Sequence, residues 1–281
     1  MVENRPFLNV ITHLILIVGV LIVAFPVYIA VIAATHGPLA LTSGTMPMLP
    51  GGELINNIVS VLTIERRGVA PFWLMTWNSL LMAVIITVGK IAISIISAYA
   101  IVYFRFPGRQ LVFWLIFITL MLPVEVRIIP TFKVVADLGL LNSYAGLTIP
   151  LIASATATFL FRQFFMTVPD ELMEAARVDG AGPIKFFRDI LLPLSRTNIA
   201  ALSVILFIYG WIQYLWPMLV TTDPKYYTLM MGVKRMAASN GDAVPEWNLI
   251  MAAVVLAMLP PVLIVIFMQR LFVKGLVETE K

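Results

Sequence analysis

The stretch VPDELMEAARVDGAGPIKFFRDILLPL at residues 168–194 decides the fold, because its prolines, glycines and charges fall where helices begin and end. Pro169 followed by Asp170 and Glu171 is typical of a helix start. Proline fits the first turn of a helix, and acidic side chains favour the positive end of the helix dipole. Gly180 indicates the end of this first helix, since glycine adopts the left-handed cap conformation at little cost.

A second short helix is expected directly after Gly182 and Pro183. Apolar residues recur at helical spacing over 184–191 against charged ones, namely Ile184, Phe187 and Leu191 against Lys185, Arg188 and Asp189. Pro193 is expected to end it. The pattern therefore predicts a helical hairpin within a polar connection at 166–197.

The chain around this hairpin is apolar. Hydrophobic residues make up 60% of its 281 residues and charged residues 12%, which leaves too little polar surface for a soluble globule. About 20 apolar helical residues cross the hydrocarbon core of a membrane. The uncharged runs predict an all-α integral membrane protein, a single domain over 1–281. Its six transmembrane helices are expected at about 12–34, 74–104, 110–130, 142–165, 198–220 and 248–270. The first run follows Arg5 but is long for the apolar part of a cleaved signal peptide.

Six spans place both termini on one side, and the Lys and Arg residues of the short loops indicate which side. With cytoplasmic termini, the inner segments carry the larger set: Arg5, Arg105, Arg109, Arg162, Arg177, Lys185, Arg188, Arg196, Arg270, Lys274 and Lys281. The outer segments carry the smaller set: Arg66, Arg67, Arg127, Lys133, Lys225, Lys234 and Arg235. The hairpin then lies in the cytoplasm, between the fourth and fifth spans.

Small side chains in the hairpin indicate a docking surface. Ala175 and Ala176 allow another surface to approach the helix backbone closely, and Glu174 beside them accepts hydrogen bonds from a basic group. A rigid pair of short helices is suited to a groove on a partner. The alternative is a solvated connector whose charges only keep it in water.

The spacing of seven hairpin residues resembles the signature of ABC importer permease subunits. The signature reads Glu-Ala-Ala, three residues, Gly, nine residues, then Ile-x-Leu-Pro, and here it is Glu174, Ala175, Ala176, Gly180, Ile190, Leu192 and Pro193. In that family the hairpin is the coupling helix, which docks in a cleft of a cytoplasmic ATPase subunit. The resemblance therefore implies that these seven residues dock an ATPase.

The resemblance also implies the partners. They are a second permease subunit, two ATPase subunits, a periplasmic substrate-binding protein and the lipids of the bacterial inner membrane. The sequence has no G-x-x-x-x-G-K-[ST] phosphate-binding loop, so ATP and Mg²⁺ are expected on the ATPase and no cofactor on this chain. With no cysteine and only His13 and His36, neither a catalytic nor a metal site is expected. A nucleic-acid partner is not expected either.

Longer segments resemble particular members of the family. Residues 78–109 are similar to carbohydrate-type permeases, and 121–132, 155–181 and 207–220 to the second permease subunit of sn-glycerol 3-phosphate importers. This implies half of a translocation pore for sn-glycerol 3-phosphate, with glycerophosphodiesters as a further substrate class. A sugar or polyol importer is the alternative within the family. An ion-coupled secondary transporter, with repeated halves and buried coupling residues, is the alternative outside it.

Six residues in or near the spans are candidates for the substrate path: Lys90, Glu125, Arg127, Trp211, Gln213 and Tyr214. Lys90 either attracts an anionic phosphate or faces a partner subunit or snorkels to the surface. Glu125 and Arg127 form an outer gate, receive the binding protein or anchor the span at the interface. The aromatic residues suit an interfacial belt, while the Gln213 amide needs partners if it is buried. The chain departs from the family at Ile212, where Asn is usual after the tryptophan, and this weakens a substrate role for the segment.

Overall fold

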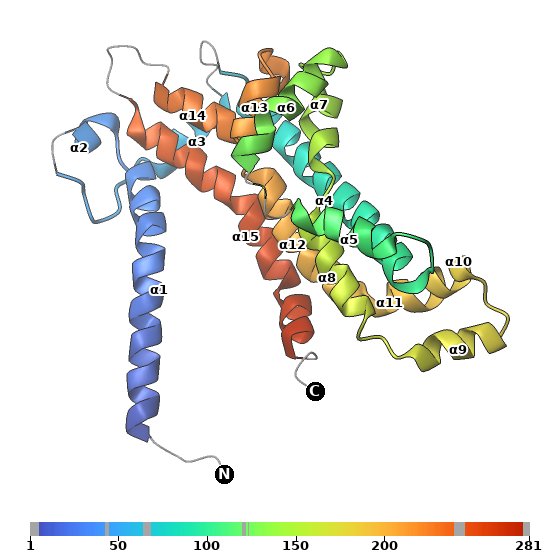
Figure 1. Cartoon of the computed structure of the whole chain (residues 1–281). Helices are drawn as coiled ribbons and strands as arrows, with labels where there is room; N and C mark the ends of the chain where they lie inside the picture. The colour runs from blue at the N-terminus through green and yellow to red at the C-terminus, as the bar shows by residue number, and fades with distance from the viewer. Residues whose placement is uncertain are drawn as a thin grey trace. The chain divides into compact units, whose positions relative to one another are not determined.

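The computed structural model describes residues 6–42, 45–63, 69–119, 122, 124–238 and 245–277, with backbone alone for residues 6, 124, 125 and 270–277. Every regular element in these ranges is helical, as predicted (Figure 1). The elements are α1 (Pro6–Ala34), α2 (Pro38–Thr42), α3 (Leu54–Thr63), α4 (Phe72–Tyr103), α5 (Arg109–Ile118), α6 (Val124–Asp137), α7 (Tyr144–Thr148), η1 (Ile149–Leu151), α8 (Ala155–Phe165), α9 (Asp170–Val178), α10 (Pro183–Phe186), η2 (Phe187–Leu191), α11 (Leu192–Leu194), α12 (Arg196–Trp211), α13 (Leu215–Val220), η3 (Pro224–Tyr226), α14 (Leu229–Ala238) and α15 (Trp247–Val277).

Three helices of the described ranges are long and apolar enough to cross a membrane, over Phe7–Ala34, Phe72–Tyr103 and Trp247–Gln269. Two bent helix pairs are also long and apolar enough to cross a membrane when the two helices of each pair are taken together. Tyr144–Leu151 with Ala155–Phe165 is bent by 44°, and Pro183–Leu194 with Arg196–Trp211 by 70°. If each pair is one span, the described chain has up to five.

The region of the expected third span holds two helices instead of one. α5 ends at Ile118 and α6 begins at Val124, so the apolar part is short. α6 also carries four charged residues in its sequence, which lower its hydropathy: Glu125, Arg127, Lys133 and Asp137. These charges explain why α5 and α6 together are less apolar than a membrane span requires.

The chain folds as two compact units, and the first comprises Met1–Trp73 with Gly232–Leu259. In this unit Asn57 joins the end of α1 to α3 and α15. The Asn57 amide donates to the carbonyls of Ala34 and His36, each at 2.9 Å, and accepts a hydrogen bond from Asn248 at 2.8 Å. Most of α1 is otherwise uncovered, as the 77% exposure of Val23 illustrates.

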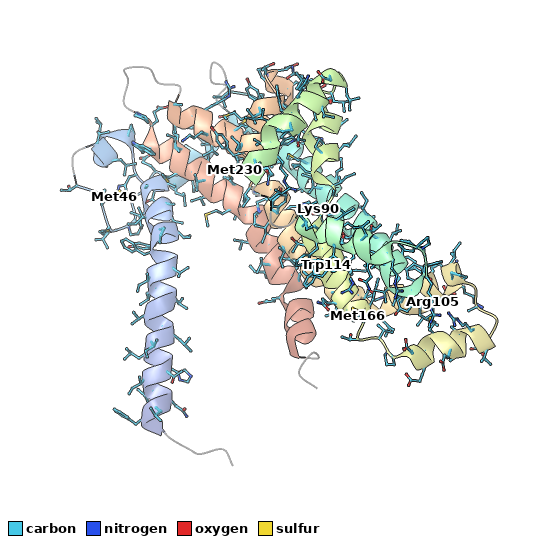
Figure 2. The ribbon with its side chains drawn as sticks, in the orientation of Figure 1. Met46, Lys90, Arg105, Trp114, Met166 and Met230 are labelled. Atoms are coloured by element: carbon cyan, nitrogen blue, oxygen red, sulfur yellow. The ribbon has the colours of Figure 1, made fainter. Side chains whose placement is uncertain are left out.

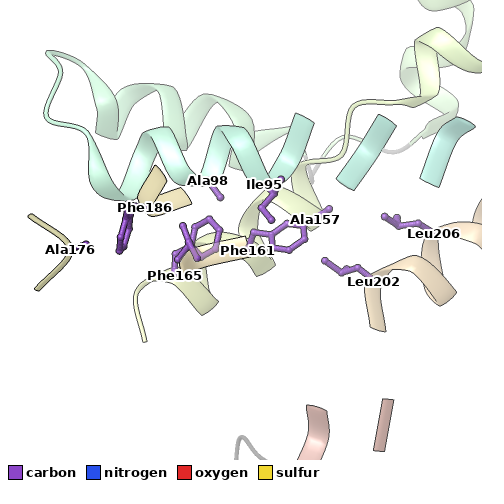
Figure 3. Packing of buried hydrophobic residues seen from close by; sticks show 10 residues of the cluster. Ile95, Ala98, Ala157, Phe161, Phe165, Ala176, Phe186, Leu202 and Leu206 are labelled. Carbon is purple, nitrogen blue, oxygen red and sulfur yellow. The ribbon is translucent and has the colours of Figure 1, made fainter. Parts of the chain in front are cut away.

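The second unit comprises Leu74–Met231 with Pro260–Lys281. Phe161 and Phe165 of α8 are fully buried in one of its apolar clusters, which also takes residues from α4, α12 and the hairpin (Figure 3). Another cluster joins α4, α6, α7 and α13 around Trp216. Buried hydrogen bonds support this packing, since the Asn78 amide donates to the carbonyls of Lys225 and Tyr227 at 2.8 and 2.9 Å.

Candidate functional site

The first helix of the hairpin, α9, has the boundaries that the sequence predicts. Pro169 occupies the cap position before Asp170, and both acids of the first turn follow it. At the other end Gly180 has a φ of +72°. The amide of Ala181 donates to the carbonyl of Ala176 at 2.8 Å, and the amide of Gly180 to that of Arg177 at 3.0 Å. These are the two hydrogen bonds of a Schellman cap, which ends a helix tightly.

The second arm of the hairpin is longer than predicted. α10 continues through a single π-helical turn, η2, into α11, which contains Pro193. Proline cannot donate the regular helical hydrogen bond, and a wide π turn is a common place for a helix to accommodate such a defect. The chain turns only at Ser195, which is buried and donates through its hydroxyl to the carbonyl of Leu191 at 2.6 Å. The prediction that Pro193 ends this helix was therefore wrong by two residues.

The seven signature residues divide between the surface and the interior. Glu174, Ala175 and Gly180 are exposed, while Ile190, Leu192 and Pro193 are partly buried. Ala176 is only 4% exposed and belongs to the apolar cluster with Phe165 and Phe186 (Figure 3). The small side chain at Ala176 thus serves the packing of the hairpin on its own unit, and Ala175 alone of the two alanines is open to a partner.

The hairpin is fixed to the end of α4 by aromatic residues. Tyr99 donates to the carbonyl of Pro183 at 2.9 Å, and its ring centroid lies 4.9 Å from that of Phe187. The ring of Tyr103 lies 5.3 Å from that of Phe186. These contacts attach the second arm of the hairpin, α10 with η2, to the C-terminal end of α4.

A cavity of about 900 Å³ lies between α9 and the end of α4. Its lining includes the basic residues Arg105, Arg109 and Arg177 and the acidic residues Asp170 and Glu174. Among the described residues no ion pair joins these two sets. Arg105 and Arg109 were not among the predicted site residues, although their position on either side of the Pro107–Gly108 turn places them just after the C-terminal end of α4.

An exposed ion pair lies on the outside of the hairpin. The Nε atom of Arg188 donates to Oδ1 of Asp189 at 2.7 Å. This hydrogen bond lowers the pKa of the Asp189 carboxyl below its ordinary value. A lowered pKa means that the pair stabilises the hairpin at neutral pH and that this contribution disappears as acid protonates the carboxyl. Exposed pairs contribute little, so the effect is small.

The candidate path residues do not all come together. Lys90 of α4 is 7% exposed, with its Nζ atom 3.7 Å from the centre of the Tyr209 ring on α12 (Figure 2). Its own unit covers it, so a lysine that snorkels or faces a partner does not fit. Gln213 Nε2 donates to the backbone carbonyl of Tyr209 at 3.1 Å, which joins the Gln213 side chain to the same turn of α12.

The remaining candidates are more dispersed. Arg127 is exposed on α6, and Tyr214 is partly buried just before α13. Trp211 is buried and stacked on Phe207 with ring centroids 5.9 Å apart. Glu125 lies in α6, and its side chain is outside the described part of the structure.

Tyr209 is the residue of this group that sequence reasoning missed. In the sequence it lies beside Trp211 and Tyr214, and such a group of aromatic residues is typical of an interfacial belt. A lysine within a span needs a partner for its charge, and an aromatic ring in another span is one option. Nothing in the sequence indicates which ring it is, because the pairing joins residues of α4 and α12 that are distant in the chain.

The long apolar helices and the helical hairpin carry the sequence of a known family of membrane proteins. Residues 90–278 match the family of binding-protein-dependent transport system inner membrane components. The chain therefore belongs to this family and is a multi-pass inner-membrane permease component of an ABC transporter, not an enzyme. This confirms the family prediction.

Curated relatives match the chain from end to end. It is 59% identical to the sn-glycerol-3-phosphate transport system permease protein UgpE of Salmonella typhi, and 57% identical to the proteins of that name from Brucella melitensis and Escherichia coli K12. Each match covers 100% of both chains.

Two solved structures share the fold. A chain of a bacterial ABC transporter involved in the import of the acidic polysaccharide alginate is 20% identical, with a TM-score of 0.81 over 96% of this chain and 98% of that one. A chain of the alginate transporter in complex with an alginate pentasaccharide-bound periplasmic protein is 17% identical, with a TM-score of 0.64 over 94% and 93%.

Proposed function

We propose that this chain forms one half of the translocation pore of an ATP-driven importer for sn-glycerol 3-phosphate. The observation that carries the proposal is the 57–59% identity, over the whole chain, to permease subunits named for that substrate. Glycerophosphodiesters, which share the glycerol phosphate group, are a second substrate class. The solved relatives concern alginate, but at 17–20% identity they inform the fold and not the substrate.

The proposed complex has the partners that the family resemblance implies. A second permease subunit completes the pore, two ATPase subunits bind ATP with Mg²⁺ in the cytoplasm, and a periplasmic protein delivers the substrate. In this arrangement the chain has six spans over 12–34, 74–104, 110–130, 142–165, 198–220 and 248–270. Both termini are cytoplasmic, and the connection at 166–197 holds the coupling hairpin.

In the proposed mechanism, ATP closes the ATPase pair and the hairpin carries that motion to the spans. Glu174 and Ala175 are the exposed part of the docking surface, with Gly180 at its end. Ala176, Ile190 and Leu192 hold the hairpin on its own unit, and Pro193 next to Leu192 is partly buried. The Tyr99 hydrogen bond to the Pro183 carbonyl then links the hairpin to α4 directly. No covalent chemistry is required of the chain.

The substrate assignment is tested by reconstituting the chain with its partners in proteoliposomes. We expect the substrate-loaded binding protein to stimulate ATP hydrolysis with sn-glycerol 3-phosphate and not with maltose-like sugars. Stimulation by the sugars alone would assign the chain to a sugar importer. Coupling of uptake to an ion gradient without ATP would place it among secondary transporters.

The docking assignment is tested by Glu174→Arg. Reversing an exposed charge at the docking surface is expected to abolish ATPase binding and substrate-stimulated hydrolysis, while membrane insertion stays normal. Asp179→Arg is the matched control. It makes the same change of charge at the cap of the same helix, on a different face, where a basic group suits the helix dipole. Equal loss in both variants, or normal coupling in Glu174→Arg, would contradict the docking role.

A further inference from the structure

Lys90 is a buried cation without a carboxylate partner among the side chains that the structure describes. It lies near the middle of α4, a 32-residue helix that spans the membrane. A charge at that depth is costly to insert, and such residues usually mark a pathway or a pair. Its visible partner is the face of the Tyr209 ring, 3.7 Å away. A ring face stabilises an ammonium group only in part.

A second cation belongs to a helix that packs beside this pair. Arg127 of α6 is exposed, and the next residue, Ile128, packs in the same apolar cluster as Tyr209. A structural ion pair would place an acid next to Lys90, whereas here a second base adds to the positive potential. Two basic groups in a region of low dielectric attract an anion strongly.

A helix that carries Tyr209 is broken close to these residues. α12 ends at Trp211 and α13 begins at Leu215, so residues 212–214 interrupt the helical backbone. At membrane depth, irregular backbone is tolerated where it is buried in protein or lines a cavity, and transporter substrate sites use such breaks. Gln213 of this break is joined to Tyr209 by the hydrogen bond to its carbonyl.

We propose that Lys90, Arg127 and Tyr209 form a phosphoryl-binding station in this half of the pore, which receives the phosphate group of the substrate as it crosses the membrane. The inference rests on the proposed function, because it requires a phosphate-bearing substrate. In the empty pore the Tyr209 ring holds the ammonium group in place. A phosphate dianion offers strong charged acceptors and replaces the weaker ring contact.

The uncharged ring of Tyr209 suits an anion-binding site better than a carboxylate at the same position would. An aspartate or glutamate at the position of Tyr209 would neutralise Lys90 permanently and repel the substrate. The aromatic ring holds the lysine in position and leaves its amino group available to an anion. The station therefore selects for anionic substrates through the permease itself, in addition to the selection by the binding protein.

The test measures uptake of radiolabelled sn-glycerol 3-phosphate into proteoliposomes that contain the full complex, at saturating binding protein. We expect Lys90→Met and Arg127→Gln each to reduce the maximal rate about tenfold or more, the loss of one charge-assisted contact. Lys90→Arg retains the charge and should keep most of the activity. The affinity of the isolated binding protein for its substrate should not change, since it lies outside the membrane unit.

Lys133→Met is the matched control. It removes a lysine of α6 that is exposed and pairs with Asp137 at 3.1 Å, so uptake should remain normal. Normal uptake by Lys90→Met would overturn the station. A fall in melting temperature of Lys90→Met that accompanies its loss of uptake would also overturn it, since this would show that Lys90 is structural. If the unmodified complex fails to take up sn-glycerol 3-phosphate, the proposed function fails and not this inference alone.

Discussion

Gly180 at the end of α9 has a backbone conformation that other residues rarely adopt, with a φ of +72°. A side chain at this position would meet no atom within 4 Å, so crowding is absent and the backbone alone is strained. An L-residue in the left-handed region costs about 1–2 kcal/mol. Gly180→Ala is therefore expected to loosen the Schellman cap, and with it the orientation of α9 on the hairpin.

The measurement is hydrogen exchange of the hairpin amides in detergent. A loss of about 1 kcal/mol makes local opening roughly fivefold more frequent, so the Ala181 amide should exchange faster by that factor. Gly182→Ala is the control, because Gly182 has a φ of −70° and equally open space around it. The strain argument would be wrong if both substitutions had the same effect.

At the scale of the helix, close approach of α4 and α12 depends on one residue. A Cβ atom at Gly210 would lie 2.8 Å from the Cα atom of Ala83. The neighbour is backbone, so no side-chain rotation relieves the contact, and small residues are what allow membrane helices to approach this closely. Gly210→Val is expected to push the helices apart and to separate Lys90 from Tyr209.

This prediction is checked by thermal unfolding of the purified protein. Overpacking costs about 1–3 kcal/mol, which corresponds to a fall of about 5 °C in Tm. Gly19→Val is the control, since it adds the same branched side chain to α1 where no atom lies within 4 Å. An unchanged Tm for Gly210→Val would mean that α4 and α12 are not held this closely.

The helix boundaries show how much of the structure the sequence determines locally. Pro169 and Gly180 predicted α9 because both residues act through their own backbone. The break at 212–214 was also predictable from the sequence, since the ring of Pro217 clashes with the carbonyl of Gln213, four residues earlier. It was not among the predictions. The helix that passes through Pro193 was not predictable, because burial of Ser195 decides where the chain turns.

The candidate site was likewise predictable only in part from the sequence. The seven signature residues were found from spacing within one short segment. Their separate roles were not, because Ala175 and Ala176 are identical in sequence and only tertiary packing buries one of them. The stack of Lys90 on Tyr209 joins two distant helices, and a single sequence carries no signal for such a pairing.

For the whole molecule, the topology depends on how α5 and α6 lie in the membrane. Their charges keep them below the hydropathy of a span, and the described helices alone give up to five crossings. Two cytoplasmic termini require an even number of crossings, and α5 with α6 would supply the sixth. The two arrangements differ in the number of crossings between the loop before α3 and the hairpin, which is two without α5 and α6 and three with them.

Single cysteines distinguish these arrangements, because the sequence contains no cysteine of its own. Gly52→Cys lies in open space in the loop before α3, and Val178→Cys lies at a hairpin position that is 88% exposed. With three crossings between them, a membrane-impermeant maleimide added to spheroplasts should label Gly52→Cys at once and Val178→Cys only after permeabilisation. The variant that carries both cysteines is labelled before and after permeabilisation, as the control for the reactivity of the two thiols. Labelling of both sites from outside would leave α5 and α6 out of the membrane, and the reverse pattern would invert the orientation. The excess of Lys and Arg on the hairpin side favours the first result, since such residues stay in the cytoplasm during insertion.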